Sequence, residues 1–167
     1  MFNRLDEFFE TYQHFTAGTL KLLDALDDAC LSCPVTAGHR TLGQIAWHIT
    51  TSVPEMMGRT GLKLGDLRGD ARPPAKAKEI AAAYRKASTE LVQAMRDHWS
   101  DATLNETDDM YGDRWPRGLT LRILLDHEIH HRGQMTVLMR QASLKVPGIF
   151  GPAKEEWAAM GMKAPEF

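Results

Sequence analysis

The richest chemical signal in the sequence is a cluster of histidines in the segment 124–134, LLDHEIHHRGQ. If this segment is a helix, His127 and His131 are four residues apart and lie on the same face, one turn from each other. Two neutral imidazoles at this spacing can share one divalent metal ion, but a stable site normally needs a third protein ligand. The segment therefore predicts part of a metal site, and the remaining ligand has to come from elsewhere in the chain.

The histidines outside this segment are the first candidates for the third ligand: His14, His39, His48 and His98. His48 is the best placed, because apolar neighbours such as Ile45 and Ile49 turn its helix towards a core. A buried imidazole without a partner costs about 1–3 kcal/mol, and metal binding removes that cost. We therefore predict one divalent metal ion bound by His48, His127 and His131, with a fourth position open to water or substrate. The simpler alternative is that these histidines are hydrogen-bonded core residues.

The same letters permit a second interpretation, since the segment 127–131, HEIHH, satisfies H-E-x-x-H, a zinc-protease motif in which the glutamate is the general base. The longer form of this motif is absent, because Gly133 lies two residues after His131 instead of three and no histidine follows. The sequence also predicts no edge strand to hold a peptide. A small zinc hydrolase is therefore a minor alternative. Glu128 and Asp126 flank the first histidine, but neither can be assigned as a catalytic acid or base.

Residues near the histidines carry weaker expectations. Arg132 points off the ligand face and is expected to pair with an acid or a neighbouring chain, while His130 is expected to pack on or hydrogen-bond to the next helix. Gly133 is expected to permit close helix approach. Gln134 lies three residues after His131, where its side chain can orient that ring.

Two further features lie outside the histidine-rich segment. Trp115 and Asp113 fall in the connection before it and are expected to border the metal pocket. Cys30 and Cys33 form a single C-x-x-C pair, without the βαβ context of a redox motif or the second pair of a zinc ribbon. We expect two incidental thiols at a helix end, and their role stays open.

Hydrophobic spacing predicts four helices, over residues 5–29, from Thr41 to about 57, 76–99 and 120–141. The second begins with a capping box between Thr41 and Gln44, and the fourth is expected to turn Ile129 and Val137 inward. Two long connections, 58–74 and 101–118, separate the helices, and a short helical turn is expected around Trp157. No strand is predicted. This pattern is typical of an all-α four-helix bundle, with the metal site between the second and fourth helices.

Composition and charge restrict the function further. The 167 residues suit one domain, 1–167, that buries a core without disulfides. The formal net charge is −2 with both signs interspersed, so nucleic acid is not an expected partner. No apolar run approaches the roughly 18 residues that cross a bilayer, and the first residues do not resemble a signal peptide. We therefore expect a cytoplasmic protein without a membrane partner.

At its histidine motifs the chain resembles the DinB-like superfamily of metal-binding four-helix bundles, also called DinB/YfiT-like. The resemblance rests on 43–49 (GQIAWHI), on 127–134, which matches the signature His-x-x-x-His-Arg-Gly-Gln, and on 146–152 (VPGIFGP). It implies an up-down-down-up bundle that is frequently a homodimer, and a zinc or nickel ion held by His48 and the 127/131 pair. Characterised relatives include enzymes that use low-molecular-weight thiols.

Two hypotheses from different classes follow. The first is a metal-dependent enzyme that acts on a small-molecule substrate, as a thiol-dependent S-transferase or a related isomerase or hydrolase, with a low-molecular-weight thiol as cosubstrate. The second is a non-catalytic metal-binding module of the stress-response, DNA-damage-inducible type. An open fourth ligand position favours the enzyme, whereas a closed one favours the module.

Overall fold

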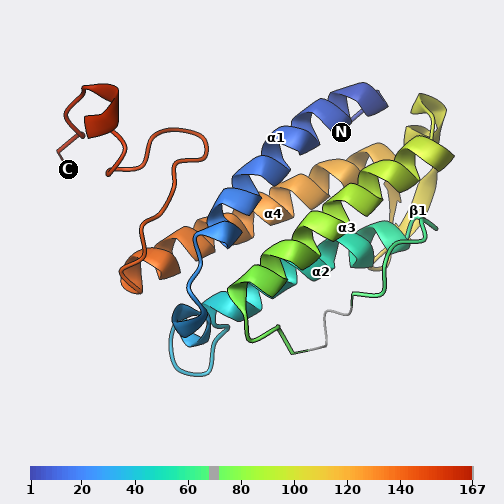
Figure 1. The fold of residues 1–167 in the computed structure, drawn as a ribbon. Coiled ribbons are helices and arrows are strands. Elements are labelled where there is room, and N and C mark those ends of the chain that lie inside the picture. Colours follow the sequence, from blue (N-terminus) through green and yellow to red (C-terminus); the bar gives the residue numbers. More distant parts are fainter. Residues whose placement is uncertain (68–71, 167) are drawn as a thin grey trace.

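The computed structural model describes residues 1–67 and 72–166 and contains four long helices. Their bounds are α1 Leu5–Asp24, α2 Leu42–Gly58, α3 Ala77–His98 and α4 Arg117–Gln141 (Figure 1). The shorter elements are the 3₁₀ helices η1 Asp28–Ser32, η2 Asp101–Asn105 and η3 Ala158–Met160, and the strands β1 Thr107–Met110 and β2 Asp113–Pro116. The prediction of an all-α four-helix bundle is confirmed, and the single domain stays a prediction.

The helices follow the predicted up-down-down-up order. In Figure 1, α1 and α4 run in one direction and α2 and α3 in the other. Both α1 and α2 contact α3 and α4, so α2 lies directly beside the helix with the histidine pair. Because α2 and α3 are parallel neighbours, the chain between them must return along the bundle, which explains the long predicted connection. Its residues 68–71 lie outside the described residues.

The predicted capping box fixes the start of α2. Thr41 Oγ1 accepts a hydrogen bond from the backbone N–H of Gln44 (3.2 Å), and Gln44 Oε1 accepts one from the backbone N–H of Thr41 (2.8 Å). The preceding η1 packs on the same turn, since a Cβ added to Gly43 would lie 2.9 Å from the carbonyl oxygen of Leu31. Glycine at this position therefore lets η1 sit against the helix that carries His48.

The first helix ends earlier than predicted. α1 stops at Asp24, and the chain up to residue 29 turns into η1 instead of continuing the helix. Asp27 Oδ1 accepts a hydrogen bond from the backbone N–H of Ala29 (2.9 Å) and caps the 3₁₀ turn. The turn also buries Leu31. Local capping therefore outweighs the apolar spacing in this segment.

The inward face of α4 agrees only in part with the one that its apolar residues predict. The prediction that Ile129 and Val137 face inward is wrong, because they are 37% and 58% exposed. Leu124 and Leu138 do face inward, at 1% and 2% exposed, and they share the interior face with three polar residues: Glu128, His131 and Arg132 are 2%, 7% and 3% exposed. A hydrophobicity pattern assigns Glu128 and Arg132 to the surface, and it therefore predicts the inward face only in part.

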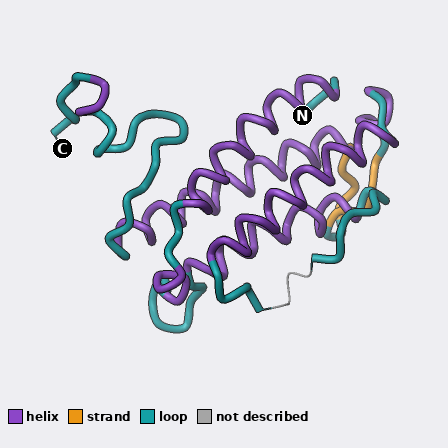
Figure 2. The backbone as a smooth tube through the Cα atoms, in the orientation of Figure 1, coloured by secondary structure: helices purple, strands orange, loops and turns teal. Residues whose placement is uncertain are grey.

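The second predicted connection, residues 101–118, contains a β-hairpin, so the prediction that the chain contains no strand is wrong. β1 and β2 pair antiparallel at one end of the bundle, with Met110 opposite Asp113 (Figure 2). The turn residues Tyr111 and Gly112 have φ angles of 61° and 94°, as in the two-residue turns that suit hairpins. The strands are rich in charged residues and lack the apolar alternation that predicts strands. α4 also begins directly after β2, at Arg117 rather than near residue 120.

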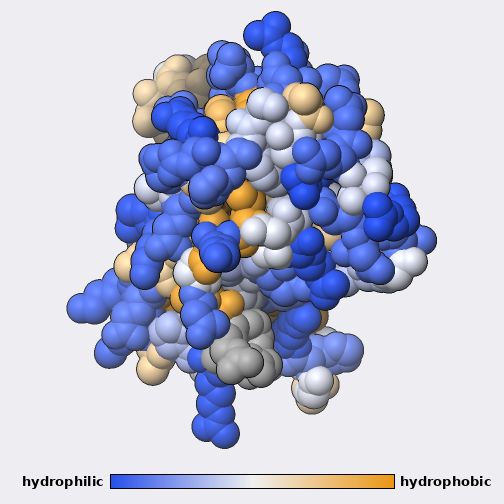
Figure 3. Space-filling view, turned by 90° about the vertical axis from the view of Figure 1, so that its right-hand side faces the viewer, coloured by the Kyte–Doolittle hydropathy of each residue, from blue (hydrophilic) through white to orange (hydrophobic). Residues whose placement is uncertain are grey.

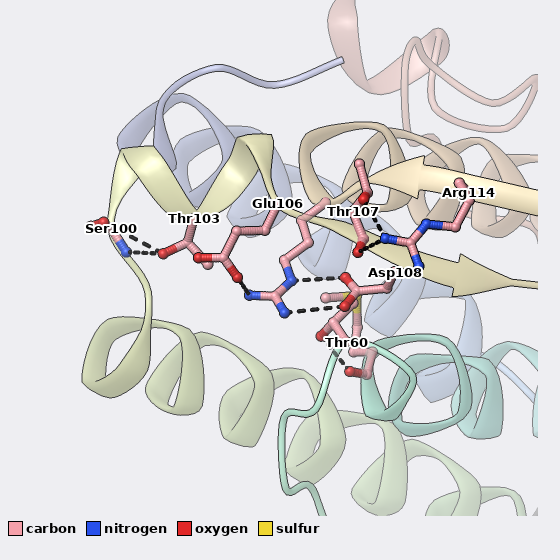
Figure 4. A network of polar contacts seen from close by, with 9 residues as sticks. Thr60, Ser100, Thr103, Glu106, Thr107, Asp108 and Arg114 are labelled. Carbon is pink, nitrogen blue, oxygen red and sulfur yellow. Dashed lines mark hydrogen bonds and ion pairs between the residues drawn. The ribbon is translucent and has the colours of Figure 1, made fainter.

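Arg117 ties the base of the hairpin to the bundle. Its guanidinium pairs with Glu106 (2.6 Å) and with Asp108 (2.8 Å). Figure 4 shows the carboxylates of Glu106 and Asp108 on either side of one guanidinium, that of Arg117. Arg114 of β2 donates to Thr107 of β1 in the same view. The side chains of Arg117 and Asp108 are each 15% exposed, so their ion pair is largely shielded from solvent.

After α4 the chain leaves the helices. Phe150 packs on Phe15 of α1, with ring centroids 5.6 Å apart, and beyond it the chain extends away from the bundle to η3, next to Trp157 (Figure 1).

The hairpin end of the bundle is covered mainly by hydrophilic residues (Figure 3). In the described part of the chain, no helix combines the length and apolar character needed to cross a membrane.

We expect Arg117→Ala to lower the free energy of unfolding by about 1–3 kcal/mol, because the shielded carboxylate of Asp108 loses its cation. Urea denaturation followed by circular dichroism measures the change. The control is Arg122→Ala, which removes an exposed i,i+4 pair with Asp126 and should cost less than about 0.5 kcal/mol. Equal losses in both variants would show that the Arg117 pair does not anchor the hairpin.

Candidate metal centre

The structure brings the three predicted histidines together between α2 and α4. Nε2 of His127 lies 3.1 Å from Nε2 of His48 and 3.1 Å from Nε2 of His131. The three candidate ligand atoms all lie within 4.8 Å of one another, and the ring planes are inclined to each other by 71° to 86°. One ion could therefore contact a nitrogen of each ring.

This geometry fits a single divalent ion. A tetrahedral ion with metal–nitrogen distances of about 2.0–2.1 Å separates its ligand nitrogens by roughly 3.3 Å, close to the 3.1 Å observed. Gln134 Oε1 lies 2.8 Å from Nδ1 of His131. Because an amide oxygen only accepts, this contact places the ring proton on Nδ1 and leaves the lone pair on Nε2. The contact predicted between Gln134 and His131 is confirmed.

Burial keeps the three imidazoles neutral. It lowers the pKa of His48 and of His127 to about 4, and it also lowers the pKa of His131. The guanidinium of Arg40 and the neighbouring histidines act in the same direction. Metal binding requires deprotonated imidazoles, so the rings are ready to bind at neutral pH without giving up protons.

Glu128 takes no part in this site. It is 2% exposed and points into the core, where its carboxylate accepts hydrogen bonds from Thr19 Oγ1 and from Tyr84 Oη (3.0 Å). Helical geometry explains this, since the residue after His127 is turned by about 100° around the helix. A zinc-hydrolase base must lie beside a water on the metal. The position of Glu128 excludes that role and, with it, the H-E-x-x-H hypothesis.

Arg132, His130 and Gly133 lie next to the histidine pair in the sequence and do not belong to the histidine cluster. Arg132 lies off the ligand face as predicted, and its Nη1 donates to the carbonyl oxygen of Phe15 on α1 (3.1 Å). His130 is exposed and contacts the Gln134 amide (3.1 Å) rather than the next helix. The prediction that Gly133 permits close helix approach is wrong, because a Cβ added there would have no neighbour within 4 Å.

A cavity of about 470 Å³ opens from the histidines along the groove between α2 and α4. His48 and His127 form one end of it. The remaining walls are Thr51, Ser52, Glu55 and Met56 of α2, Ile123 of α4, and Tyr111 at the tip of the hairpin. A cavity of this size suits a small molecule.

Sequence reasoning identified none of the cavity walls, and Glu55 and Tyr111 are the two among them that carry an ionisable side chain. Glu55 could have been found, because it lies seven positions after His48 and therefore on the same face of a helix. Tyr111 could not, because the hairpin that carries it is not predicted. Trp115, expected at the pocket, packs against Tyr111 instead, with ring centroids 6.0 Å apart. Asp113 lies in β2 and does not line the cavity.

The cysteine pair lies outside the metal centre. Cys30 and Cys33 are free thiols of intermediate burial, in η1 and directly after it. Neither lines the cavity beside the histidines, and neither belongs to the histidine cluster. Their role stays open.

Comparisons with known proteins agree with this architecture. A family model described as "DinB family" matches residues 1–166. The uncharacterised protein YrdA of Bacillus subtilis (strain 168) is 44% identical over 166 residues, which cover 99% of each chain. The crystal structure of a DinB-like protein from Bacillus cereus ATCC 10987 superposes with a TM-score of 0.86 at 42% identity, covering 90% of this chain and all of that one. A DinB-like protein of Bacillus subtilis, YjoA, is 15% identical over 84% of this chain and 97% of its own, and its TM-score of 0.65 shows the fold alone.

We expect the metal-free protein to lose stability as the pH falls from about 6.5 to about 4. His48 and His127 bind protons near pH 4 in the folded state but near pH 6.5 when unfolded. In this window the unfolded state binds more protons, so the free energy of unfolding decreases with falling pH. Urea titrations at a series of pH values measure it. A His48→Gln/His127→Gln double variant should show a shallower decrease, and an unchanged slope would assign the effect to other groups.

Proposed function

Because the chain belongs to the DinB family, we propose that it is a metal-dependent enzyme that binds one divalent ion through His48, His127 and His131 and acts on a small molecule. The observation that carries this proposal is the convergence of three neutral Nε2 atoms, with successive separations of 3.1 Å, at the end of a cavity. Three histidines that leave one position for an outside ligand are typical of catalytic zinc sites.

Zinc or nickel is the proposed ion. Neutral imidazoles suit both metals, and the candidate ligand set contains only histidines. When bound, such an ion acts as a Lewis acid and lowers the pKa of a thiol or water in its open position. Gln134 orients the ring of His131, and the cavity walls position the remainder of the substrate.

The proposed reaction is transfer to or from a low-molecular-weight thiol, with isomerisation and hydrolysis as related reactions that the same site could support. The cavity of about 470 Å³ beside His48 and His127 can accommodate a small thiol or a small substrate. Its apolar walls, Met56 and Ile123, can cover the hydrocarbon part of such a molecule. No residue of the described chain is assigned as a general acid or base.

A second candidate function is a non-catalytic metal-binding module of the stress-response type, in which the ion joins α2 to α4 and stabilises the fold. The cavity that reaches His48 and His127 favours the enzyme, because a purely structural ion needs no access for a second ligand.

A homodimer also remains a proposal, and the exposed apolar side chains of Ile129, Val137 and Phe150 support it.

We expect the protein, purified without a histidine tag, to bind about one zinc or nickel ion per chain. Alanine at position 48, 127 or 131 should each abolish this stoichiometric binding, because two imidazoles alone hold an ion weakly. His98→Ala is the control and should keep the ion, since His98 is exposed at the end of α3 and does not belong to the histidine cluster. Elemental analysis after dialysis measures the content. Absence of uptake by the unmodified protein, or retention by all three variants, would overturn the proposal.

Gln134→Leu should lower metal affinity by roughly 10–100-fold, because the acceptor that fixes the tautomer and orientation of His131 is lost. Competition with a chromophoric chelator measures the affinity. Gln141→Leu, at the exposed end of α4, controls for the loss of an amide elsewhere on the same helix. An unchanged affinity in Gln134→Leu would show that this contact does not support the site.

A further inference from the structure

The far end of the cavity is shaped by a residue in an unfavourable backbone conformation. Tyr111 has a φ of 61° at the first position of the hairpin turn, before Gly112 at 94°. Two-residue turns of this kind favour Asn, Asp or Gly at the first position, and bulky residues are rare there. Residues held in such conformations gather at functional sites. The phenol of Tyr111 is thus held at the cavity by a turn for which tyrosine is poorly suited.

A polar clamp holds the tip of the hairpin on α2. Tyr111 Oη donates to Glu55 Oε2 (2.6 Å), and Arg59 Nε donates to Glu55 Oε1 (2.9 Å). The guanidinium of Arg59 also lies 4.2 Å from the centroid of the Tyr111 ring. Partial burial and the bond to Glu55 raise the pKa of Tyr111 to about 12, so the phenol keeps its proton and remains a donor to the carboxylate.

Each hydroxyl group that lines this part of the cavity donates its proton to a hydrogen bond within the protein. Ser52 Oγ donates to the carbonyl oxygen of His48 (2.7 Å), and Thr51 Oγ1 donates to the carbonyl oxygen of Trp47 (3.1 Å). Tyr111 donates to Glu55. A hydroxyl has one proton and two lone pairs, and each carboxylate oxygen can accept a second hydrogen bond. Apart from the imidazoles, these polar side chains therefore offer a ligand only acceptors.

The acceptors lie at a distance from the histidines that a small molecule can span. Glu55 is seven residues after His48, two turns along the same face of α2 and about 10 Å along its axis. Met56 and Ile123 line the cavity as apolar walls. Glu55 is the one acid among the described residues that line it. The histidines at one end and a carboxylate at the other give the two ends of the pocket different chemistry.

We propose that the Glu55–Tyr111 end of the cavity binds the protonated amine of a small molecule whose opposite end binds the metal. An ammonium group supplies only donors and one positive charge. The cavity wall offers it acceptors and the second oxygen of the Glu55 carboxylate, while Arg59, the other partner of Glu55, does not line the cavity. Tyr111 positions the carboxylate, and Glu55 determines the charge specificity. The inference rests on the proposed function, because it requires a metal at the three histidines.

Three thiols of similar length and different charge test this inference on the cobalt(II)-loaded protein: 3-aminopropane-1-thiol, 3-mercaptopropan-1-ol and 3-mercaptopropionate. Binding of a thiol to cobalt changes its visible absorption, so a titration gives each Kd. In the unmodified protein we expect the aminothiol to bind about tenfold more tightly than the alcohol, the effect of one charge-assisted hydrogen bond. In Glu55→Gln this preference should fall to less than about threefold, while the metal content stays unchanged, because Glu55 is not a ligand of the ion. Glu10→Gln, an exposed position on α1, should keep the full preference.

Each outcome separates the two proposals. If the unmodified protein takes up no metal, the proposed function and this inference both fail. If it binds metal and thiols but does not prefer the aminothiol, or keeps the same preference in Glu55→Gln, the metal site stands and the assignment of the Glu55–Tyr111 end is wrong.

Discussion

The position of α2 along and around α4 is the constraint on which the rest of the structure depends. His127 and His131 are one turn apart on one helix, so their spacing needs no support from elsewhere. His48 must reach the same point from another helix, 3.1 Å from His127. A displacement by one residue along α2 would move it by about 1.5 Å and turn it by about 100°. The capping box and the contact of η1 fix α2, while Arg117 fixes the start of α4, so that distant features of the chain all act on this one distance.

The buried polar face of α4 sets the rotation of that helix. Glu128 accepts from Thr19 on α1 and from Tyr84 on α3, and Arg132 donates to the backbone of α1. Burial raises the pKa of Glu128, which shows how unfavourable this place is for a charge. Because a buried polar group without its partners is costly, rotating α4 would break these contacts. The network that excludes Glu128 from metal chemistry therefore turns the histidines towards α2.

The sequence was sufficient for the helical bundle and for the pair His127 and His131, because both follow from local spacing, whereas His48 was predicted from the apolar residues around it and from the family resemblance. The i,i+4 pair and the capping box at Thr41 need only one helix each. The inward face of α4 was predicted only in part, because Glu128 and Arg132 are polar yet buried, with partners on α1 and α3 that no local pattern shows. The hairpin escaped prediction because its strands are charged and its hold on the bundle comes from the Arg117 pairs and the single buried side chain of Met110. Tyr111 reaches the cavity through that hairpin, so the hairpin end of the pocket was hidden while its histidine end was visible.

The positions of the ligands in the chain have an evolutionary consequence. His48 and His127 are 79 residues apart, so a bound ion would close the intervening chain, with α3 and the hairpin, into a single loop. The entropy of closing a flexible loop grows only with the logarithm of its length, by about 0.6 kcal/mol for each doubling. An insertion at the tip of the hairpin that keeps the pair of Arg117 and Asp108 would therefore add little to this entropy. Changes in the length of the tip, which carries Tyr111, can thus alter the cavity wall at little entropic cost to the joining of His48 and His127.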